Sequence, residues 1–255
     1  MEFYKYQGTG NDFVIIDNRQ LTVDLSVSQV KHICDRKFGV GADGLILLQN
    51  HAEHDFEMVY FNSDGNQSSM CGNGGRCLIA FASQLGIFSK TCTFMAIDGL
   101  HHGKIESDVV HLKMMDVNHV ECGEGFYFMD TGSPHYVVLE DSLKELDIVS
   151  RAREIRYNRR FKDDGTNVNF LSPQQASVRT YERGVEDETL SCGTGVTACA
   201  LVMNTIDPEK YSNSCSIFTE GGQLSVSFVK KDEHSYENIW LIGPAVMVYS
   251  GEIHV

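Results

Sequence analysis

Apolar residues along the chain form short continuous runs that alternate with runs at helical spacing. In the first half, the short runs typical of buried strands are 12–18, 44–49, 56–61 and 109–114. Helical spacing predicts one helix at about 26–38, with Gly39 at its C′ position. It predicts a second helix at about 73–85, stopped by Gly86. Strands alternating with helices predict an α/β fold with mixed sheets.

The second half repeats this order of elements. Its predicted strands and helices are 135–141, 148–157 (helix), 167–171, 176–181, 194–206 (helix), 224–229 and 239–243. Matched landmarks keep a similar spacing, because Cys71 and Cys192 are 121 residues apart, and Gly99 and Gly221 are 122 apart. Any α/β chain alternates strands and helices, but the Cys-Gly-x-Gly shared by both halves favours two similar halves.

Each Cys-Gly-x-Gly stands directly before a predicted apolar helix. Unpaired N–H groups and the positive end of the helix dipole favour a thiolate and a bound carboxylate there. If the two halves face each other, Cys71 and Cys192 meet across a central cleft. One thiolate would then remove a Cα proton while the other thiol supplies one to the opposite face. For an isolated cysteine, the ordinary interpretation is a small buried hydrophobic residue.

Composition excludes several classes of function. The net charge of −14 argues against a nucleic-acid partner, and no segment has the length of apolar sequence that spans a membrane. The first residues lack the features of a signal peptide, so we expect a cytoplasmic protein whose eight cysteines are thiols. No cysteine spacing is typical of zinc sites. The glycines of 39–44 follow a helix and precede a strand, which is the wrong context for dinucleotide binding.

Six segments resemble the diaminopimelate epimerase family, in the family's order. They are "GTGNDFVIID", "GVGADGLILL", "FNSDGNQSSMCGNGGRC", "GSPHYVV", "TNVNF" and "YERGVEDETLSCGTG". The resemblance implies inversion of one stereocentre, from L,L- to meso-diaminopimelate, without pyridoxal phosphate, another cofactor or a metal, on the route to lysine and peptidoglycan precursors. It also implies that Cys71 and Cys192 are the acid/base pair, and that His135 and Glu182 tune them.

The resemblance further implies a set of substrate contacts. These are Asn11, Asn62, Gly72, Asn73, Asn167, Glu182, Arg183, Gly193 and Thr194. The Arg183 guanidinium suits the distal carboxylate of the substrate, and the N–H groups after each cysteine suit the reacting one. Two positions depart from the family pattern: Gly44 replaces a glutamine that touches substrate in some members, and Ser133 replaces an asparagine.

The expected architecture is a diaminopimelate epimerase-like fold of two pseudo-symmetric halves, each a mixed sheet or barrel around a central helix. We place the N-terminal half at 1–115, joined by the last strand at 245–255, and the C-terminal half at 116–244. The family also implies a homodimer. Two alternatives stay open: a related racemase, epimerase or isomerase with another substrate such as hydroxyproline, and a non-catalytic amino-acid binder or thiol redox sensor.

Overall fold

The computed structural model describes residues 1–254 and divides the chain into two compact units. One unit contains residues 1–112 and the C-terminal segment from Gly243, and the other contains residues 113–242. Val255, the last residue of the segment predicted at 245–255, lies outside the described residues. Among residues 1–254, no helix has both the length and the apolar character needed to cross a membrane.

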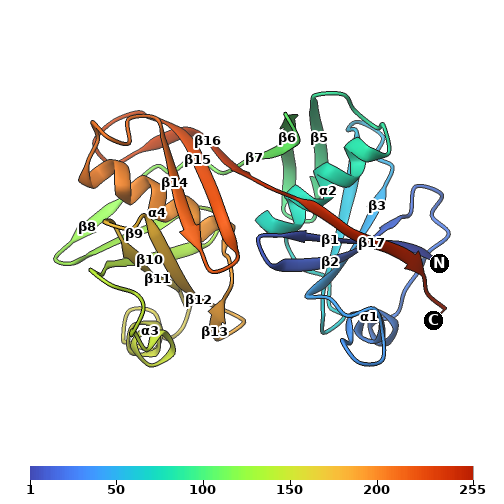
Figure 1. The fold of residues 1–255 in the computed structure, drawn as a ribbon, viewed down its shortest axis with the longest axis horizontal. Helices are drawn as coiled ribbons and strands as arrows, with labels where there is room; N and C mark the ends of the chain where they lie inside the picture. Colours follow the sequence, from blue (N-terminus) through green and yellow to red (C-terminus); the bar gives the residue numbers. More distant parts are fainter. Residues whose placement is uncertain (255) are drawn as a thin grey trace. The chain divides into compact units, whose positions relative to one another are not determined.

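The N-terminal unit is a mixed sheet with two helices. Its elements are β1 (Glu2–Gly8), β2 (Asn11–Asp17), α1 (Val27–Cys34), β3 (Gly44–Gln49), β4 (Phe56–Asn62), α2 (Gly72–Gln84), β5 (Thr91–Ala96), β6 (Gly99–Glu106), β7 (Val109–Lys113) and the returning β17 (Val246–Glu252). β17 pairs antiparallel with β1, as Figure 1 shows. The pairs β2–β3 and β4–β5 are parallel, while β1–β2, β3–β4, β5–β6 and β6–β7 are antiparallel.

The C-terminal unit repeats this topology. Its elements are β8 (Glu121–Gly123), β9 (Phe126–Asp130), β10 (Pro134–Leu139), α3 (Ile148–Arg156), β11 (Asn167–Ser172), β12 (Ser177–Glu182), β13 (Asp187–Thr189), α4 (Gly193–Ile206), β14 (Ser214–Thr219), β15 (Gly222–Lys230) and β16 (Tyr236–Gly243). Here β10–β11 and β12–β14 are the parallel pairs. The other pairs are antiparallel, with β13 added beside β12. The predicted fold of two similar α/β halves is therefore confirmed.

Each unit curls its sheet around one apolar helix. α2 contacts β17, β1, β2 and β3 as well as β6, and α4 contacts β9, β10, β11 and β12 as well as β14 and β15. Nearly all of α4 is buried, which is the expected state of a helix that is apolar on every side. β3 and β11 are likewise buried along almost their whole length, as expected for strands covered on both faces.

The two outer helices begin at polar caps. Ser26 and Gln29 form a capping box at the start of α1, and the Asp147 carboxylate accepts from the Ser150 N–H at the start of α3. In contrast, the caps of α2 and α4 are the two motif cysteines. Neither cysteine side chain makes a capping hydrogen bond, so both thiols remain available for chemistry.

The prediction for the first helix was wrong in its extent. α1 ends at Cys34 instead of reaching residue 38, and the positive φ of +79° belongs to Gly41. Gly39 has a different role, because a Cβ there would lie only 1.9 Å from the His32 carbonyl oxygen. The chain folds back over the end of the helix, and the Val40 and Gly41 N–H groups donate to the Ile33 carbonyl. The strands β1, β5, β6, β8, β9, β13 and β14 were not predicted.

Candidate active site

Both motif cysteines occupy the N-cap of the central helix in their unit. Cys71 precedes α2 and Cys192 precedes α4, each with an extended backbone and neither with its side chain acting as a cap. Their carbonyls accept the first helical hydrogen bonds, from the Gly75 N–H at 2.7 Å and the Val196 N–H at 2.9 Å. Each cysteine therefore directly precedes the first N–H groups of a helix, at the end where negative charge is stabilised.

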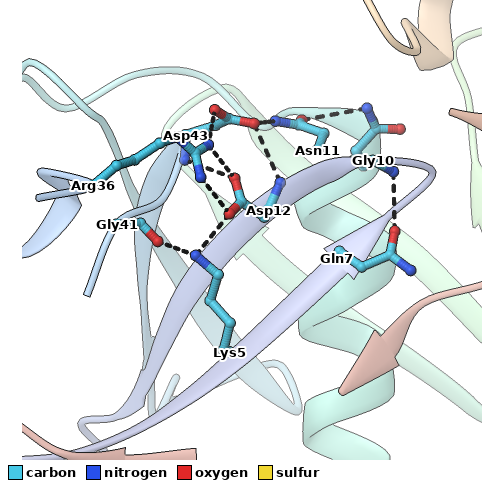
Figure 2. Close-up of polar contacts among 9 residues, drawn as sticks. Lys5, Gln7, Gly10, Asn11, Asp12, Arg36, Gly41 and Asp43 are labelled. Atoms are coloured by element: carbon cyan, nitrogen blue, oxygen red, sulfur yellow. Dashed lines mark hydrogen bonds and ion pairs between the residues drawn. The ribbon is translucent and has the colours of Figure 1, made fainter. Parts of the chain in front are cut away.

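The Cys71 sulfur lies within a cluster of side-chain amides. Its Sγ is 3.6 Å from Asn11 Oδ1, and Asn73 Nδ2 donates to the same oxygen at 3.3 Å. Asn11 Nδ2 in turn donates to the Asp43 carboxylate at 2.7 Å, as Figure 2 shows. The structure thus brings together three of the predicted site residues, Cys71, Asn11 and Asn73, and adds Asp43.

A fully buried arginine supports the first turn of α2. The Arg76 guanidinium donates to Asn73 Oδ1 at 3.0 Å and to the Gly72 carbonyl at 3.3 Å. Burial lowers the pKa of Arg76, and the neighbouring thiols of Cys77 and Cys71 act in the opposite direction. Among residues 1–254, no carboxylate lies within ion-pair distance of this guanidinium. The first turn of α2 therefore carries an arginine without a neutralising acid.

The Cys192 sulfur has a different set of neighbours. Its Sγ is 3.4 Å from Thr194 Oγ1, and the same hydroxyl is 2.8 Å from His135 Nε2. Burial raises the pKa of Glu182, against the opposing hydrogen bonds from Thr189 and Cys192. Thr189 Oγ1 donates to Glu182 Oε1 at 2.5 Å. Cys192 is thus placed beside a carboxyl group and a hydroxyl.

The His135 ring is held neutral with a defined tautomer. Burial lowers the pKa of His135 to about 3, so the ring is uncharged at neutral pH. Asn169 Nδ2 lies 3.0 Å from Nδ1 and can only donate, which leaves the proton on Nε2, facing Thr194. A Cβ at Gly195 would lie 2.5 Å from Asn169 Oδ1, so glycine is needed there for the helix to approach this pair. The ring therefore acts as a hydrogen-bond donor toward Thr194.

A second cluster lies beside the start of β11. Asn167 Oδ1 accepts from the Arg183 backbone N–H at 2.9 Å, and Asn167 Nδ2 donates to Ser133 Oγ at 2.9 Å. The exposed Arg183 guanidinium reaches the Asp164 carbonyl at 2.8 Å and Ser133 Oγ at 3.3 Å. Ser133 thus contacts two predicted substrate residues, Asn167 and Arg183.

Asn62 and Gly44 face each other across the β3–β4 pair. They are register partners, and Asn62 is exposed at the end of β4, where its backbone N–H donates to the Asn66 carbonyl. A Cβ at Gly44 would lie 2.5 Å from the Tyr60 ring and 2.7 Å from the Phe61 carbonyl oxygen. The missing glutamine side chain therefore leaves no empty space, because the Tyr60 ring occupies it.

Among residues 1–254, no group of three or more His, Cys, Asp or Glu side chains is arranged to hold a metal ion. The clusters around both motif cysteines are built from amides, hydroxyls, single carboxylates, one imidazole and one guanidinium. These groups suit the binding of carboxylates and the control of protons.

Comparison with known proteins decides the family. The family model described as diaminopimelate epimerase matches this chain over residues 3–120 and again over 127–248. The chain belongs to the diaminopimelate epimerase family. It is 51% identical to the diaminopimelate epimerase of Flavobacterium psychrophilum, over 99% of this chain and 100% of that one. It is 41% identical to that of Chlorobaculum tepidum, over 96% of this chain and 98% of that one. The resemblance seen in the sequence is confirmed.

Solved structures with low sequence identity share the fold of this family member. A Bacillus anthracis phenazine biosynthesis protein of the PhzF family aligns with a TM-score of 0.72 at 13% identity, covering 100% of this chain and 99% of that one. A hydroxyproline epimerase from Agrobacterium vitis aligns with a TM-score of 0.66 at 15% identity, covering 98% and 91%. At these identities the likeness concerns the fold alone.

Several residues of the two clusters were not predicted from the sequence. These are Asp43, Arg76, Asn169 and Thr189. A signal existed for Asn169, because two asparagines alternate in the buried strand "NVNF" and therefore project from the same face. Buried polar residues at such positions need hydrogen-bond partners, so this pattern indicates a polar cluster around Asn167 and Asn169. Asp43 and Arg76 lie in the family-like segments "GVGADGLILL" and "FNSDGNQSSMCGNGGRC", but their contacts depend on the tertiary structure.

Proposed function

We propose that this protein interconverts L,L- and meso-diaminopimelate, with Cys71 and Cys192 as its two proton carriers. The observation that carries the proposal is that each unit places a cysteine at the N-cap of its central helix, in a chain of the diaminopimelate epimerase family. Inversion at Cα needs one group to remove the proton and another to supply a proton to the opposite face. One thiol in each repeated half meets this need.

The proton transfers balance in a simple way. A thiolate takes the Cα proton and becomes a thiol, and the C–H electron pair moves into the substrate carboxylate. The second thiol then gives its proton to the opposite face of Cα and becomes the thiolate. The N–H groups of Gly72, Asn73, Gly193 and Thr194, at the first turns of α2 and α4, suit the carboxylate on which negative charge develops.

His135 and Glu182 set the protonation of Cys192. The Glu182 carboxyl group accepts a hydrogen bond from the Cys192 thiol, which favours the thiol form of Cys192. The neutral His135 ring fixes the Thr194 hydroxyl by donating to it, so that hydroxyl keeps a defined geometry at 3.4 Å from the sulfur. Both residues thereby act on the proton of Cys192 at short range.

The distal end of the substrate is assigned to the β11 cluster. Arg183 suits the distal carboxylate, because a guanidinium binds a carboxylate through two parallel hydrogen bonds. Asn167 and Ser133 are already linked to Arg183 and extend the same polar surface. Asn11 and Asn62 complete the proposed substrate contacts, with Glu182 as a further contact.

This activity would supply meso-diaminopimelate for lysine and peptidoglycan synthesis. We further propose that the protein works in the cytoplasm as a homodimer, as the family resemblance implies.

Proton NMR in D₂O tests the proposed function. Loss of the Cα–H signal of L,L-diaminopimelate, with formation of the meso isomer and without added pyridoxal phosphate, is the expected result. Hydroxyproline, incubated separately, is expected to keep its Cα–H signal. Exchange with hydroxyproline alone would overturn the substrate and retain the two-thiol chemistry. No exchange with either would favour the amino-acid binder or redox sensor.

A further inference from the structure

A line of hydrogen bonds crosses the Cys71 cluster between two charged groups. It begins at the Asp43 carboxylate, passes through the side-chain amides of Asn11 and Asn73, and ends at the Arg76 guanidinium. Its three links measure 2.7 Å, 3.3 Å and 3.0 Å. Cys71 joins this line at Asn11 Oδ1.

The two end groups fix the direction of every bond between them. A carboxylate accepts and does not donate, so the Asn11 NH₂ group must face Asp43, which turns its oxygen toward Cys71 and Asn73. A guanidinium donates and does not accept, so the Asn73 oxygen must face Arg76, which leaves its NH₂ group for Asn11. Amide orientation is often ambiguous, but here both ends demand the same arrangement.

Both ends are themselves held in place. Arg36 donates to Asp12 and to Asp43, and the Asp43 N–H donates to Asp12 Oδ1, as Figure 2 shows in part. The buried Lys5 donates to Asp12 and to the Gly41 carbonyl. Burial opposes ionisation of Asp12, but hydrogen bonds from Arg36 and Lys5 outweigh it and hold the pKa of Asp12 well below its usual range.

At the other end, Arg76 is fully buried. It is anchored by the Gly72 carbonyl and by Thr9 Oγ1 at 3.2 Å. Arginine keeps its charge under all ordinary conditions, so this end of the line donates at any working pH. Reversing Asn11 would therefore turn its oxygen toward the Asp43 carboxylate, and reversing Asn73 would turn its NH₂ group toward the Arg76 guanidinium.

The C-terminal unit has no equivalent of this line at the matching positions. Thr194 and Thr197 stand where the repeat spacing places Asn73 and Arg76. Thr197 Oγ1 donates to the Gly193 carbonyl at 2.9 Å, which copies only the local contact of Arg76 with Gly72. The amide line is therefore a property of the Cys71 half.

We propose that Asp43 and Arg76 are positioning residues that hold the Asn11 oxygen, and not its NH₂ group, against the Cys71 sulfur. An oxygen there accepts a hydrogen bond from the thiol and offers nothing to the thiolate. The orientation of Asn11 thus regulates how readily Cys71 gives up its proton. The link to catalysis rests on the proposed function, in which Asn11 contacts the substrate and Cys71 carries a proton.

Asp43→Asn tests the proposal while keeping the shape of a partly exposed side chain. Arg36 would hold the new side-chain oxygen, so the new NH₂ group would face Asn11 and draw its oxygen away from Cys71, at the cost of the Asn11–Asn73 hydrogen bond. An NH₂ group would then reach Cys71 and stabilise its thiolate. We expect the pH of half-maximal iodoacetamide alkylation of Cys71 to fall by about one unit. Tryptic peptide 38–76 contains Cys71 as its single cysteine, so mass spectrometry follows it directly. The peptide 184–210 contains Cys192 and Cys199, and its fragment ions assign alkylation to Cys192, which is the internal reference and should keep its profile.

Asp12→Asn is the matched control, since it removes the same charge from the same network without touching the Asn11 side chain. It is expected to shift the Cys71 profile by less than a third as much. If Asp12→Asn does not fold, Arg36→Gln replaces it: a pure charge effect would move the profile to higher pH, and the amide orientation would leave it unchanged. None of the variants substitutes the other charged and titratable groups of this region, so these groups act equally on every Cys71 profile. They are Lys5, Arg76, Cys77, Asp98 and His101.

An unchanged Cys71 profile in folded Asp43→Asn would overturn the proposal. An equal shift in Asp12→Asn would overturn it too, because the effect would then be one of charge alone. Alkylation needs no substrate, so this test stands apart from turnover. A shifted profile in a protein that does not epimerise diaminopimelate would retain the positioning role and reject the proposed function.

Discussion

The first turns of α2 and α4 share one backbone design and differ in nearly every polar neighbour. In both, a cysteine with extended backbone caps the helix and two glycines follow within three residues. Around Cys71 lie amides and the buried Arg76, whereas around Cys192 lie the Glu182 carboxyl group, the Thr194 hydroxyl and the neutral His135.

This difference has a chemical use. Two thiols in identical surroundings would favour the same protonation state, and a two-carrier inversion needs one thiolate and one thiol at the start. In the proposed function, the repeated backbone supplies the two sulfurs, and we expect the unequal side chains to separate their proton affinities. The predictions below test how far the two helix starts differ, beginning with the largest expected effect.

Replacing either motif cysteine by alanine should abolish epimerisation. Cys71→Ala and Cys192→Ala each remove one of the two proton carriers, so we expect a loss of about 10³-fold or more in turnover. Cα–H exchange in D₂O and formation of the meso isomer measure the effect. Cys77→Ala and Cys199→Ala, the matched buried cysteines of α2 and α4, are the controls and should keep their activity. Retention of a tenth of the turnover by either motif variant would contradict the two-carrier scheme.

Glu182→Gln should affect one cysteine and spare the other. It replaces the carboxyl group that accepts from the Cys192 thiol with an amide whose NH₂ group can donate to the sulfur, which makes a thiolate there easier to form. We expect alkylation of Cys192 to reach its half-maximal rate at lower pH, with turnover reduced by about 10- to 100-fold. The Cys71 profile should stay in place, and an equal movement of both profiles would show that the two sites are not electrostatically separate.

Acid should destabilise the C-terminal unit before the N-terminal one. The pKa of His135 is about 3 in the fold and near 6.5 when unfolded, so the unfolded state binds the proton more tightly. Stability from the neutral ring is complete above pH 6.5 and is lost as pH falls toward 3, by about 3 kcal/mol at pH 4. In the N-terminal unit, burial lowers the pKa of His111 in the same direction but less strongly, and the contribution of Asp12, whose pKa is lowered, is lost only below about pH 4.

Urea unfolding followed by Trp240 fluorescence measures this effect, because the single tryptophan of the chain lies in the C-terminal unit. Wild type should lose stability between pH 6.5 and pH 4. His135→Gln should start less stable and show a flatter dependence over the same interval. If the stability of the two proteins depended on pH in the same way, His135 would not be the cause of the acid destabilisation.

Alanine at the matched glycines should cost more in α4 than in α2. A Cβ at Gly195 would lie 2.5 Å from Asn169 Oδ1, which is fixed by its own hydrogen bonds. A Cβ at Gly74 would approach the ends of the Ile46 and Phe13 side chains at 3.3 Å. We expect Gly195→Ala to lower the free energy of unfolding by about 1–3 kcal/mol, and Gly74→Ala by under about 1 kcal/mol. Thermal unfolding compares the two variants. A larger loss in Gly74→Ala would show that the Asn169 side chain moves aside at little cost.

The sequence by itself determined the repeated order of elements and the place of each cysteine. Strands β2, β3, β4 and β11 and helices α2, α3 and α4 were predicted within a few residues. Their apolar residues form continuous runs or recur at helical spacing, and both patterns indicate buried elements. The end of α1 and the strands β1, β5 and β6 were missed. Their patterns mix lysines, histidines and glycines into the apolar positions, and only pairing with neighbouring strands shows that they are extended.

The candidate site was divided in the same way. The two cysteines and Asn73 stand at glycine-rich helix starts that the sequence shows, whereas Asn11, His135 and Glu182 were assigned through the family resemblance. Asp43, Arg76 and Asn169 acquire their contacts from residues 32, 67 and 34 positions away in the chain. Local sequence determines which way a helix begins. Only the folded sheet decides which charged group meets which amide, since hydrogen bonds between distant residues depend on strand register and on how closely a helix approaches its sheet.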